Sequence, residues 1–201
     1  MPGRTTRRAV PALCLMLGWV ALLWLLEGVD VLTGGALDAF GIQPRDPDEL
    51  VDVVPAAFLH FGFGHLAANT LPLLVLGFLA ALRSGIRRFL AVVLLIILAS
   101  GLGIWLTAAP NSNTVGASGV VFGLFGYLLV RGFIERSPLD IGIGLAVGVV
   151  YGSILWGALP TTAGISWQGH LFGLIGGVAA AFVLRERARG VTDSTTVRPV
   201  P

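Results

Sequence analysis

The sequence has 201 residues, of which 55% are hydrophobic and only 12% are charged, and its mean hydropathy is +0.87. Soluble domains carry charge on about a quarter of their residues, so this composition excludes an ordinary soluble protein. Charge is absent in four long blocks, residues 9–26, 53–82, 89–130 and 141–184. An uncharged apolar run of about 20 residues can cross a bilayer. The sequence therefore predicts an all-α, polytopic membrane protein.

Six membrane helices are predicted in chain order, over residues 9–30, 64–82, 89–108, 115–133, 140–158 and 167–184. They form one membrane domain, 9–184, between an N-terminal segment, 1–8, and a polar tail, 185–201, that is predicted to be disordered. The first helix has an arginine-rich start like a signal sequence, but its 18-residue uncharged core is longer than usual, so we interpret it as a retained helix. The 34–62 connection is too long for a plain loop and is predicted to contain short helices. The glycine-rich 140–158 helix and the loop after it, PTTAGISWQG, are predicted to act as a movable gate and cap.

All thirteen basic residues are arginines, and they lie in groups beside the predicted helices. The groups are Arg4, Arg7 and Arg8; Arg83, Arg87 and Arg88; Arg131 and Arg136; and Arg185, Arg187, Arg189 and Arg198, with Arg45 alone. With six helices, twelve of the thirteen fall on one side of the membrane, and the positive-inside rule makes that side the cytoplasm. We therefore expect a multi-pass protein of the cell membrane, of the bacterial plasma membrane, with both termini in the cytoplasm. The arginines do not alternate with aromatic residues, so no nucleic-acid partner is predicted.

The few polar side chains inside the predicted helices fall at one depth. Polar groups in a membrane are costly, so they mark either function or contacts between helices. These residues are His60, His65 and Asn69 at the second helix, Ser118 at the start of the fourth and His170 at the start of the sixth. The three helices all begin at the outer face in the predicted topology, and they use every histidine of the chain. We therefore predict a single site at that face.

The residue types in this group suit nucleophilic catalysis. His65 and Asn69 are four residues apart, so they share one helix face and can both donate hydrogen bonds to an anion. Ser118 becomes a nucleophile when a base removes its proton, and a neutral imidazole such as His170 is the commonest base. Since no carboxylate is near either position in the sequence, a Ser–His dyad is predicted rather than a triad.

A purely structural interpretation also fits part of the pattern. Small residues form a stripe on the fourth helix (Gly119, Gly123, Gly126) and another on the sixth (Gly173, Gly177, Ala181). Such stripes usually serve only to pack helices, and Ser118 alone would fit that role. The soluble nucleophile motif G-x-S-x-G is also incomplete, because position 120 is valine. The catalytic interpretation depends on the convergence of several residues.

Three motifs occur in a specific order. The second helix carries His65-x-x-x-Asn69, the fourth begins with Gly116-x-Ser118-Gly, and the sixth carries Gly-His170-x-x-Gly. In this order the chain resembles the rhomboid intramembrane serine proteases, in their minimal six-helix bacterial form, from the first helix to the sixth.

The resemblance implies a rhomboid-like bundle and a serine endopeptidase that cleaves transmembrane helices of other proteins near the outer membrane face. It implies that Ser118 is the nucleophile and His170 the general base and acid, while His65, Asn69 and the Ser118 N–H hold the oxyanion. It assigns supporting roles to Gly116, Gly119, Phe122, Gly173, Gly177 and His60. The expected partners are transmembrane substrates and the lipid bilayer. No cofactor or metal is expected, and no oligomeric state is predicted.

The sequence departs from the family pattern at two places. The family usually has an aromatic hydroxyl four residues after the nucleophile, where this chain has Phe122, although a phenyl ring can still pack against His170. The family's Trp-Arg pair in the first outer loop would align near Val51 and Asp52 and is absent. The second departure concerns the seating of the loop in the membrane rather than the chemistry.

Two other classes of function use the same residues. A metal-dependent membrane hydrolase could bind zinc through His60, His65 and His170. Such an enzyme usually needs a carboxylate base, and none is predicted at that depth. A small transporter or a non-catalytic rhomboid-like protein that binds its substrate could use the same cavity.

Overall fold

The structure is a computed structural model that describes residues 4–160 and 164–185. Within these ranges it is all-α and contains no β-strand, as the sequence predicts, apart from one isolated bridge between Ile42 and Thr114. Residues 161–163 of the predicted cap and all but the first residue of the predicted 185–201 tail lie outside the described residues.

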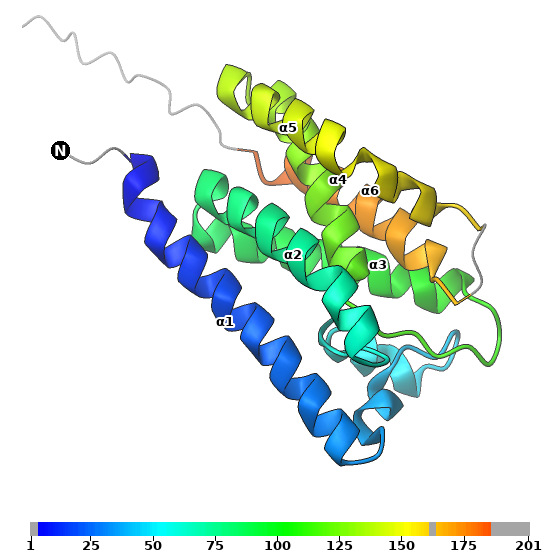
Figure 1. Ribbon diagram of the computed structural model, residues 1–201. Helices are drawn as coiled ribbons and strands as arrows, with labels where there is room; N and C mark the ends of the chain where they lie inside the picture. Colours follow the sequence, from blue (N-terminus) through cyan, green and yellow to red (C-terminus); the bar gives the residue numbers. More distant parts are fainter. Residues whose placement is uncertain (1–3, 161–163, 186–201) are drawn as a thin grey trace, which may run out of the picture.

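Six α-helices follow each other along the chain (Figure 1). They are α1 (Arg4–Leu32), α2 (Phe63–Ser84), α3 (Ile86–Thr107), α4 (Ser118–Ile134), α5 (Pro138–Tyr151) and α6 (Trp167–Val183). The long connection between α1 and α2 contains three short 3₁₀-helices, η1 (Ala36–Phe40), η2 (Asp48–Val53) and η3 (Pro55–Phe58), and a fourth, η4 (Gly152–Ala158), continues α5. The short helices expected in the 34–62 connection are therefore present.

The helix boundaries differ from the predicted ones by up to several residues, and three of the differences have local reasons. The first helix begins at Arg4 rather than at residue 9, because its arginines and threonines continue the helix although they are polar. The fourth begins at Ser118 rather than at residue 115, because Gly116 has a φ of 138°, which no helix accommodates. The predicted 140–158 helix starts earlier, with Pro138 in its first turn, and changes to 3₁₀ geometry at Gly152, where glycine weakens an α-helix.

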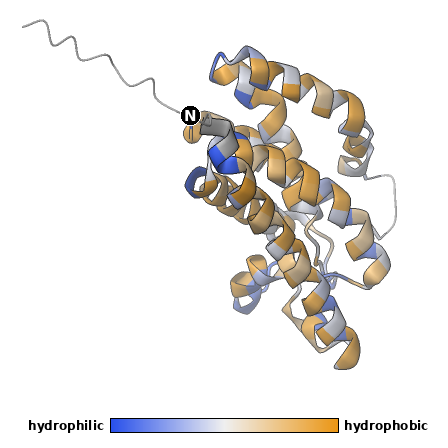
Figure 2. Cartoon of the chain, turned by 60° about the vertical axis from the view of Figure 1, so that its left-hand side comes forward, coloured by the Kyte–Doolittle hydropathy of each residue, from blue (hydrophilic) through white to orange (hydrophobic). Residues whose placement is uncertain are grey.

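The chain is a multi-pass membrane protein whose helices have different lengths. Helices α1, α2, α3 and the combined α5–η4 span are long and apolar enough to cross a membrane, whereas α4 and α6 have 17 residues each. A 17-residue helix is about 25 Å long, shorter than the roughly 30 Å hydrocarbon core. Figure 2 shows apolar residues along most of each helix and hydrophilic ones mainly at the ends. The ends of α4 and α6 therefore lie within the membrane thickness.

Helix α4 lies at the centre of the bundle and contacts α2, α3, α5 and α6, while α1 packs mainly on α2 at the far side from α5 (Figure 1). Helices α4 and α6 touch through their backbones. A side chain on Gly173 would overlap the carbonyl of Gly119, and one on Gly177 would overlap the carbonyl of Gly123. The two glycine stripes thus bring the helix that starts with Ser118 against the helix that carries His170.

One end of the bundle, where α2 and α4 end and α5 begins, contains a buried ion-pair network that we call the arginine end. The Arg83 guanidinium donates two hydrogen bonds to the Asp140 carboxylate, at 2.6 and 3.2 Å. Arg131 is only 2% exposed and donates to Glu135 at 2.7 Å, and Arg88 also pairs with Glu135. These contacts join α2, α3, α4 and α5.

Neutral groups extend the network of the arginine end. Arg131 donates to the hydroxyl of Ser84 at 2.8 Å, and Ser84 is bonded to the hydroxyl of Tyr127 at 2.8 Å. The Arg131 guanidinium also lies over the Tyr127 ring, 5.5 Å from its centroid. The charged groups there are thus held by one another within the protein.

Candidate active site

The opposite end of the bundle, which we call the site end, contains Ser118 in the first turn of α4. The first N–H groups of a helix have no acceptor within it, and the Val121 N–H is the one that bonds back to the Ala117 carbonyl, at 3.0 Å. Helix α4 therefore presents free N–H groups and the positive end of its dipole beside the Ser118 hydroxyl. This local field favours negative charge near Ser118.

The segment before Ser118 is extended and is held at four points by the 33–62 connection, which is the outer loop of the predicted topology. Ile42 exchanges two backbone hydrogen bonds with Thr114, at 2.9 and 3.2 Å. The Asn113 side chain donates to the Asp38 carbonyl at 2.7 Å, and the Gly116 N–H donates to the Ala56 carbonyl at 2.9 Å. The fourth contact is made by His60 to the backbone of Ala117.

The outer loop is seated without the family's Trp-Arg pair. The Arg45 guanidinium donates to the carbonyl of Ala108 at 2.9 Å, just after the end of α3. The indole of Trp105 donates to the Asp46 carbonyl at 2.7 Å. A cation at a helix C-terminus is favourable, so this part of the loop is fixed on α3 by other residues.

His170 lies in the first turn of α6 and is 8% exposed. Its Nδ1 lies 2.8 Å from the Gly157 carbonyl of η4, so Nδ1 carries the proton in this bond and Nε2 is left with a lone pair. The Phe122 ring stacks on the imidazole, with centroids 4.1 Å apart and planes inclined by 9°. The contact expected between Phe122 and His170 is therefore present.

A second contact fixes the first turn of α6. The Ser100 hydroxyl of α3 donates to the Gly169 carbonyl at 2.9 Å, directly before His170. Ser166 caps the helix, since its hydroxyl accepts the Gly169 N–H at 3.4 Å. The backbone that carries the imidazole is thus held from α3 and from its own helix start.

His65 and Asn69 lie on the side of Ser118 that faces α2. A side chain on Gly116 would come within 3.0 Å of His65 Nε2 and 3.7 Å of the Ser118 hydroxyl, so the ring and the hydroxyl both lie beside the position that a Gly116 side chain would occupy. Asn69 uses one amide N–H for the His65 carbonyl, at 3.1 Å. Its amide has a second N–H for another acceptor.

One cavity of about 760 Å³ connects these groups. Among the residues that line it are His65, Asn69, Ser118, Phe122 and His170. Within the described ranges, neither the Ser118 hydroxyl nor Nε2 of His170 has a hydrogen-bond partner in the protein. Five of the predicted residues therefore line one cavity, in which the Ser118 hydroxyl and Nε2 of His170 are free.

This cavity is not lined by the other predicted residues, which are Gly116, Gly119, Gly173, Gly177 and His60. His60 is 2% exposed, and its Nε2 accepts the Ala117 N–H at 3.3 Å. Burial, together with neighbouring His65, lowers the pKa of His60 from 6.5 to about 4. In the described part of the chain, no three His, Cys, Asp or Glu side chains converge on a metal position, so His60, His65 and His170 are not arranged as a zinc site.

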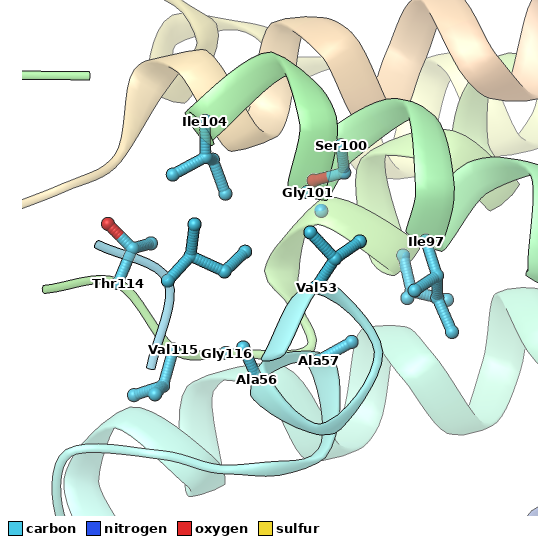
Figure 3. Close-up of a pocket in the computed structure, with 13 residues that line it drawn as sticks. Val53, Ala56, Ala57, Ile97, Ser100, Gly101, Ile104, Thr114, Val115 and Gly116 are labelled. Carbon is cyan, nitrogen blue, oxygen red and sulfur yellow. The ribbon is translucent and has the colours of Figure 1, made fainter. Parts of the chain in front are cut away.

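A second, much smaller cavity of about 20 Å³ lies behind the segment that precedes Ser118 (Figure 3). Figure 3 shows Val53, Ile97 and Ile104 around this cavity, with Val115 and Gly116 on the extended segment that precedes Ser118. A cavity of this size holds at most one water molecule. It is lined on one side by Val53, Ala56 and Ala57 and on another by the segment from Thr114 to Gly116.

Two contributors to the site were not predicted from the sequence. Gly157 acts through its backbone carbonyl, which any residue has, so no residue type signals it. Ser100 lies in an apolar helix and could have been found as a polar residue at membrane depth on the same grounds as Ser118.

The chain resembles known proteins over most of its length. Residues 47–187 match the model of the Rhomboid domain family. An uncharacterised protein of Mycobacterium tuberculosis is 47% identical over 177 residues, covering 84% of this chain and 73% of the relative. An uncharacterised protein of Mycobacterium leprae is 40% identical, with coverage of 92% and 77%. The rhomboid protease GlpG of Yersinia enterocolitica is 32% identical over 165 residues, covering 77% of this chain and 56% of GlpG. The Rhomboid domain model spans well over half of this chain. The chain therefore belongs to the rhomboid family of intramembrane serine proteases.

Proposed function

We propose that this protein is an intramembrane serine endopeptidase in which Ser118 and His170 form a catalytic dyad. One observation carries the proposal. Nε2 of His170 and the Ser118 hydroxyl open without protein partners into a single cavity, while Nδ1 of His170 is bonded to a carbonyl. This tautomer is the one that accepts a proton from a hydroxyl.

In the acylation step, the Ser118 oxygen attacks the carbonyl carbon of the substrate peptide while its proton moves to Nε2 of His170. The carbonyl oxygen becomes an oxyanion. When the tetrahedral intermediate collapses, the C–N bond breaks and the imidazolium gives its proton to the leaving amine. The product of this step is an ester between Ser118 and the acyl half of the substrate.

The oxyanion is stabilised by donors on one side of the cavity. They are His65, the second amide N–H of Asn69 and the N–H of Ser118 itself, supported by the positive end of the α4 dipole. Donors fixed in advance stabilise the charge without reorganising during the reaction. The Asn69 bond to the His65 carbonyl keeps its amide in place.

Deacylation repeats the sequence with water. His170 removes a proton from a water molecule, the resulting hydroxide attacks the ester, and the proton returns to the Ser118 oxygen as the carboxylate product leaves. Water is needed at this step, and the polar cavity supplies a route for it.

The substrate is a transmembrane helix, and freeing its backbone groups in lipid costs several kcal/mol each. We therefore expect helix-breaking residues near the cleaved bond.

The orientation follows from the arginines. The arginine end faces the cytoplasm and the site end faces the outside of a bacterial plasma membrane, because twelve of thirteen arginines then lie inside. To test this, single cysteines are placed at exposed Asp48 and exposed Arg87 in a Cys14→Ser background. An impermeant thiol reagent should label position 48 in intact cells and position 87 only after lysis. Labelling of position 87 in intact cells would reverse the orientation.

The function is tested with purified protein in detergent and a model transmembrane substrate. Ser118→Ala and His170→Ala should each reduce cleavage to background while thermal unfolding stays close to that of the wild type. A fluorophosphonate probe should label Ser118 in the wild type and not in His170→Ala. Retained cleavage by folded Ser118→Ala protein would exclude the serine mechanism.

A further inference from the structure

The η4 segment contributes the group that orients the candidate base, although η4 belongs to a loosely packed element. The buried residues of the α5–η4 span are only Asp140, Gly144, Val147 and Ala158. Val149 and Trp156 are 87% and 72% exposed. In contrast to α4 and α6, this element has most of its side chains directed away from the protein.

The two ends of the α5–η4 span are held very differently. At the arginine end, Asp140 is paired with Arg83 and Arg131, at 2.6 and 3.6 Å. There a side chain on Gly144 would come within 2.8 Å of the Leu128 carbonyl, so the α5 and α4 backbones are in close contact. At the site end, the one hydrogen bond from η4 to another element in the described ranges is the bond between Gly157 and His170.

Gly157 lies directly against the catalytic groups. A side chain there would come within 3.1 Å of the Phe122 ring and 3.2 Å of His170 Nδ1. The imidazole is thus covered on one face by Phe122 and bonded at Nδ1 by Gly157, with Nε2 free. In the described chain, no carboxylate is bonded to this histidine, so the carbonyl takes the place of the acid in a triad.

We propose that the Gly157 carbonyl is the positioning group of the dyad, and that His170 is a competent base only while η4 is seated against it. The inference rests on the proposed function. A hydrogen bond is lost when its heavy atoms separate beyond about 3.5 Å, so a displacement of η4 by about 1 Å releases Nδ1. The ring then rotates or moves its proton to Nε2, and in that form it takes no proton from Ser118.

The consequence is that entry of a substrate into the cavity and the readiness of His170 to act as a base both depend on the position of η4. Because α5–η4 is anchored at the arginine end, its site end can swing outward when a substrate helix enters the cavity, which Ile154 of η4 lines. The same movement removes the carbonyl from His170. The enzyme is inactive while open, and the dyad is reassembled when η4 returns to its seat.

The test compares two glycines of η4. Gly157→Ala places a methyl group 3.1 Å from the Phe122 ring and 3.2 Å from His170 Nδ1, so η4 and the imidazole must shift relative to each other, whereas Gly152→Ala is a matched control because nothing lies within 4 Å of a side chain there. Since a misplacement of about 1 Å can cost on the order of 100-fold in rate, we expect Gly157→Ala to slow cleavage and fluorophosphonate labelling of Ser118 by about 10- to 100-fold. Gly152→Ala should stay within about twofold of the wild type.

Nuclear magnetic resonance of isotope-labelled histidine supplies a readout that packing alone would not change. In the wild type, His170 should be the Nδ1–H tautomer, and Gly157→Ala should lose this signature while Gly152→Ala keeps it. If the tautomer and labelling rate are unchanged in Gly157→Ala, the dependence of His170 on η4 is wrong even when Ser118 remains essential. If Ser118→Ala still cleaves, the proposed function fails, and the tautomer comparison still decides the role of Gly157.

Discussion

The two ends of the bundle differ in whether their polar groups are paired within the protein. At the arginine end, buried Arg131 and Asp140 and half-buried Arg83 carry charges that are paired with one another. At the site end, the Ser118 hydroxyl and Nε2 of His170 have no protein partner and face a cavity. Polar groups are costly in either place. The comparison indicates that paired groups stabilise the fold, whereas unpaired groups that line a cavity are available for a substrate.

The largest effect that separates the two ends is expected from Asp140→Asn. This change leaves the charges of half-buried Arg83 and buried Arg131 without a carboxylate on α5. Removing one partner of a buried ion pair costs about 3–5 kcal/mol. The unfolding free energy in mixed micelles should fall by that amount, while cleavage per folded molecule remains close to that of the wild type.

Two controls make the Asp140 result specific. Asp48→Asn removes an exposed acid from the outer loop and should change stability by less than about 0.5 kcal/mol. The double variant Arg83→Met/Asp140→Leu should recover part of the loss, because it removes the unpaired charge together with its partner. Equal losses in Asp140→Asn and Asp48→Asn would mean that the network at the arginine end does not stabilise the fold.

At the site end, Asn69→Ala should lower the rate rather than the stability. Loss of one oxyanion donor typically costs about 10²–10³ in kcat, roughly 3–4 kcal/mol. We expect slow but measurable cleavage, since His65 and the Ser118 N–H remain. The measurement is kcat with a transmembrane substrate, together with the unfolding temperature in the same detergent.

Thr70→Val is the matched control for Asn69→Ala. Both side chains donate to the carbonyl one turn earlier in α2, Asn69 at 3.1 Å and Thr70 at 2.8 Å, but Thr70 also accepts from the indole of Trp24, on another face of the helix. Thr70→Val should leave kcat nearly unchanged. If Asn69→Ala lowers stability as much as rate, or if it cleaves as fast as the wild type, Asn69 is not an oxyanion donor.

The sequence predicted the parts of this comparison that depend on helix periodicity. Ser118, His65 and His170 could be brought together because each lies at the start of a helix and consecutive helices alternate in direction. The pairing of Arg83 with Asp140 was not predicted, since 57 residues separate them and the arginines were interpreted only as a topology signal. Asp140 itself gave an unused signal, as an acid in an apolar helix beside arginine groups.

The backbone contributions were beyond prediction for a different reason. The Gly157 carbonyl that holds His170 and the bridge of Ile42 with Thr114 use groups that every residue possesses. Their positions depend on how the outer loop and η4 pack in three dimensions. The late start of α4 likewise depends on the positive φ of Gly116, which the close contact with His65 requires.

The smallest predicted effect concerns His60, which lies at the site end outside the cavity and is paired at Nε2, while its buried Nδ1 has no partner in the described residues. It is buried, and its Nε2 accepts the Ala117 N–H, so the imidazole is neutral and supports the segment before Ser118. Its pKa is lowered from 6.5 to about 4, by burial first and by His65 second. We therefore expect His60 to affect stability as a function of pH, without a direct part in the chemistry.

The sign of the pH effect follows from proton binding. Between pH 6.5 and about 4, the unfolded chain binds a proton at His60 and the folded protein does not. Stability therefore rises with pH in this window and is lost as the pH falls from 6.5 towards 4. Each pKa unit corresponds to about 1.4 kcal/mol, so the contribution is at most about 3.5 kcal/mol. His60→Gln keeps an acceptor for the Ala117 N–H but cannot titrate. Thermal unfolding in detergent is measured at pH 7.5, 6, 5 and 4.5. The unfolding temperature should decline less for His60→Gln than for the wild type as the pH falls. Because the two proteins share all other acids and histidines, the difference between their curves isolates His60. Parallel curves over the whole range would mean that His60 is not buried as a neutral base.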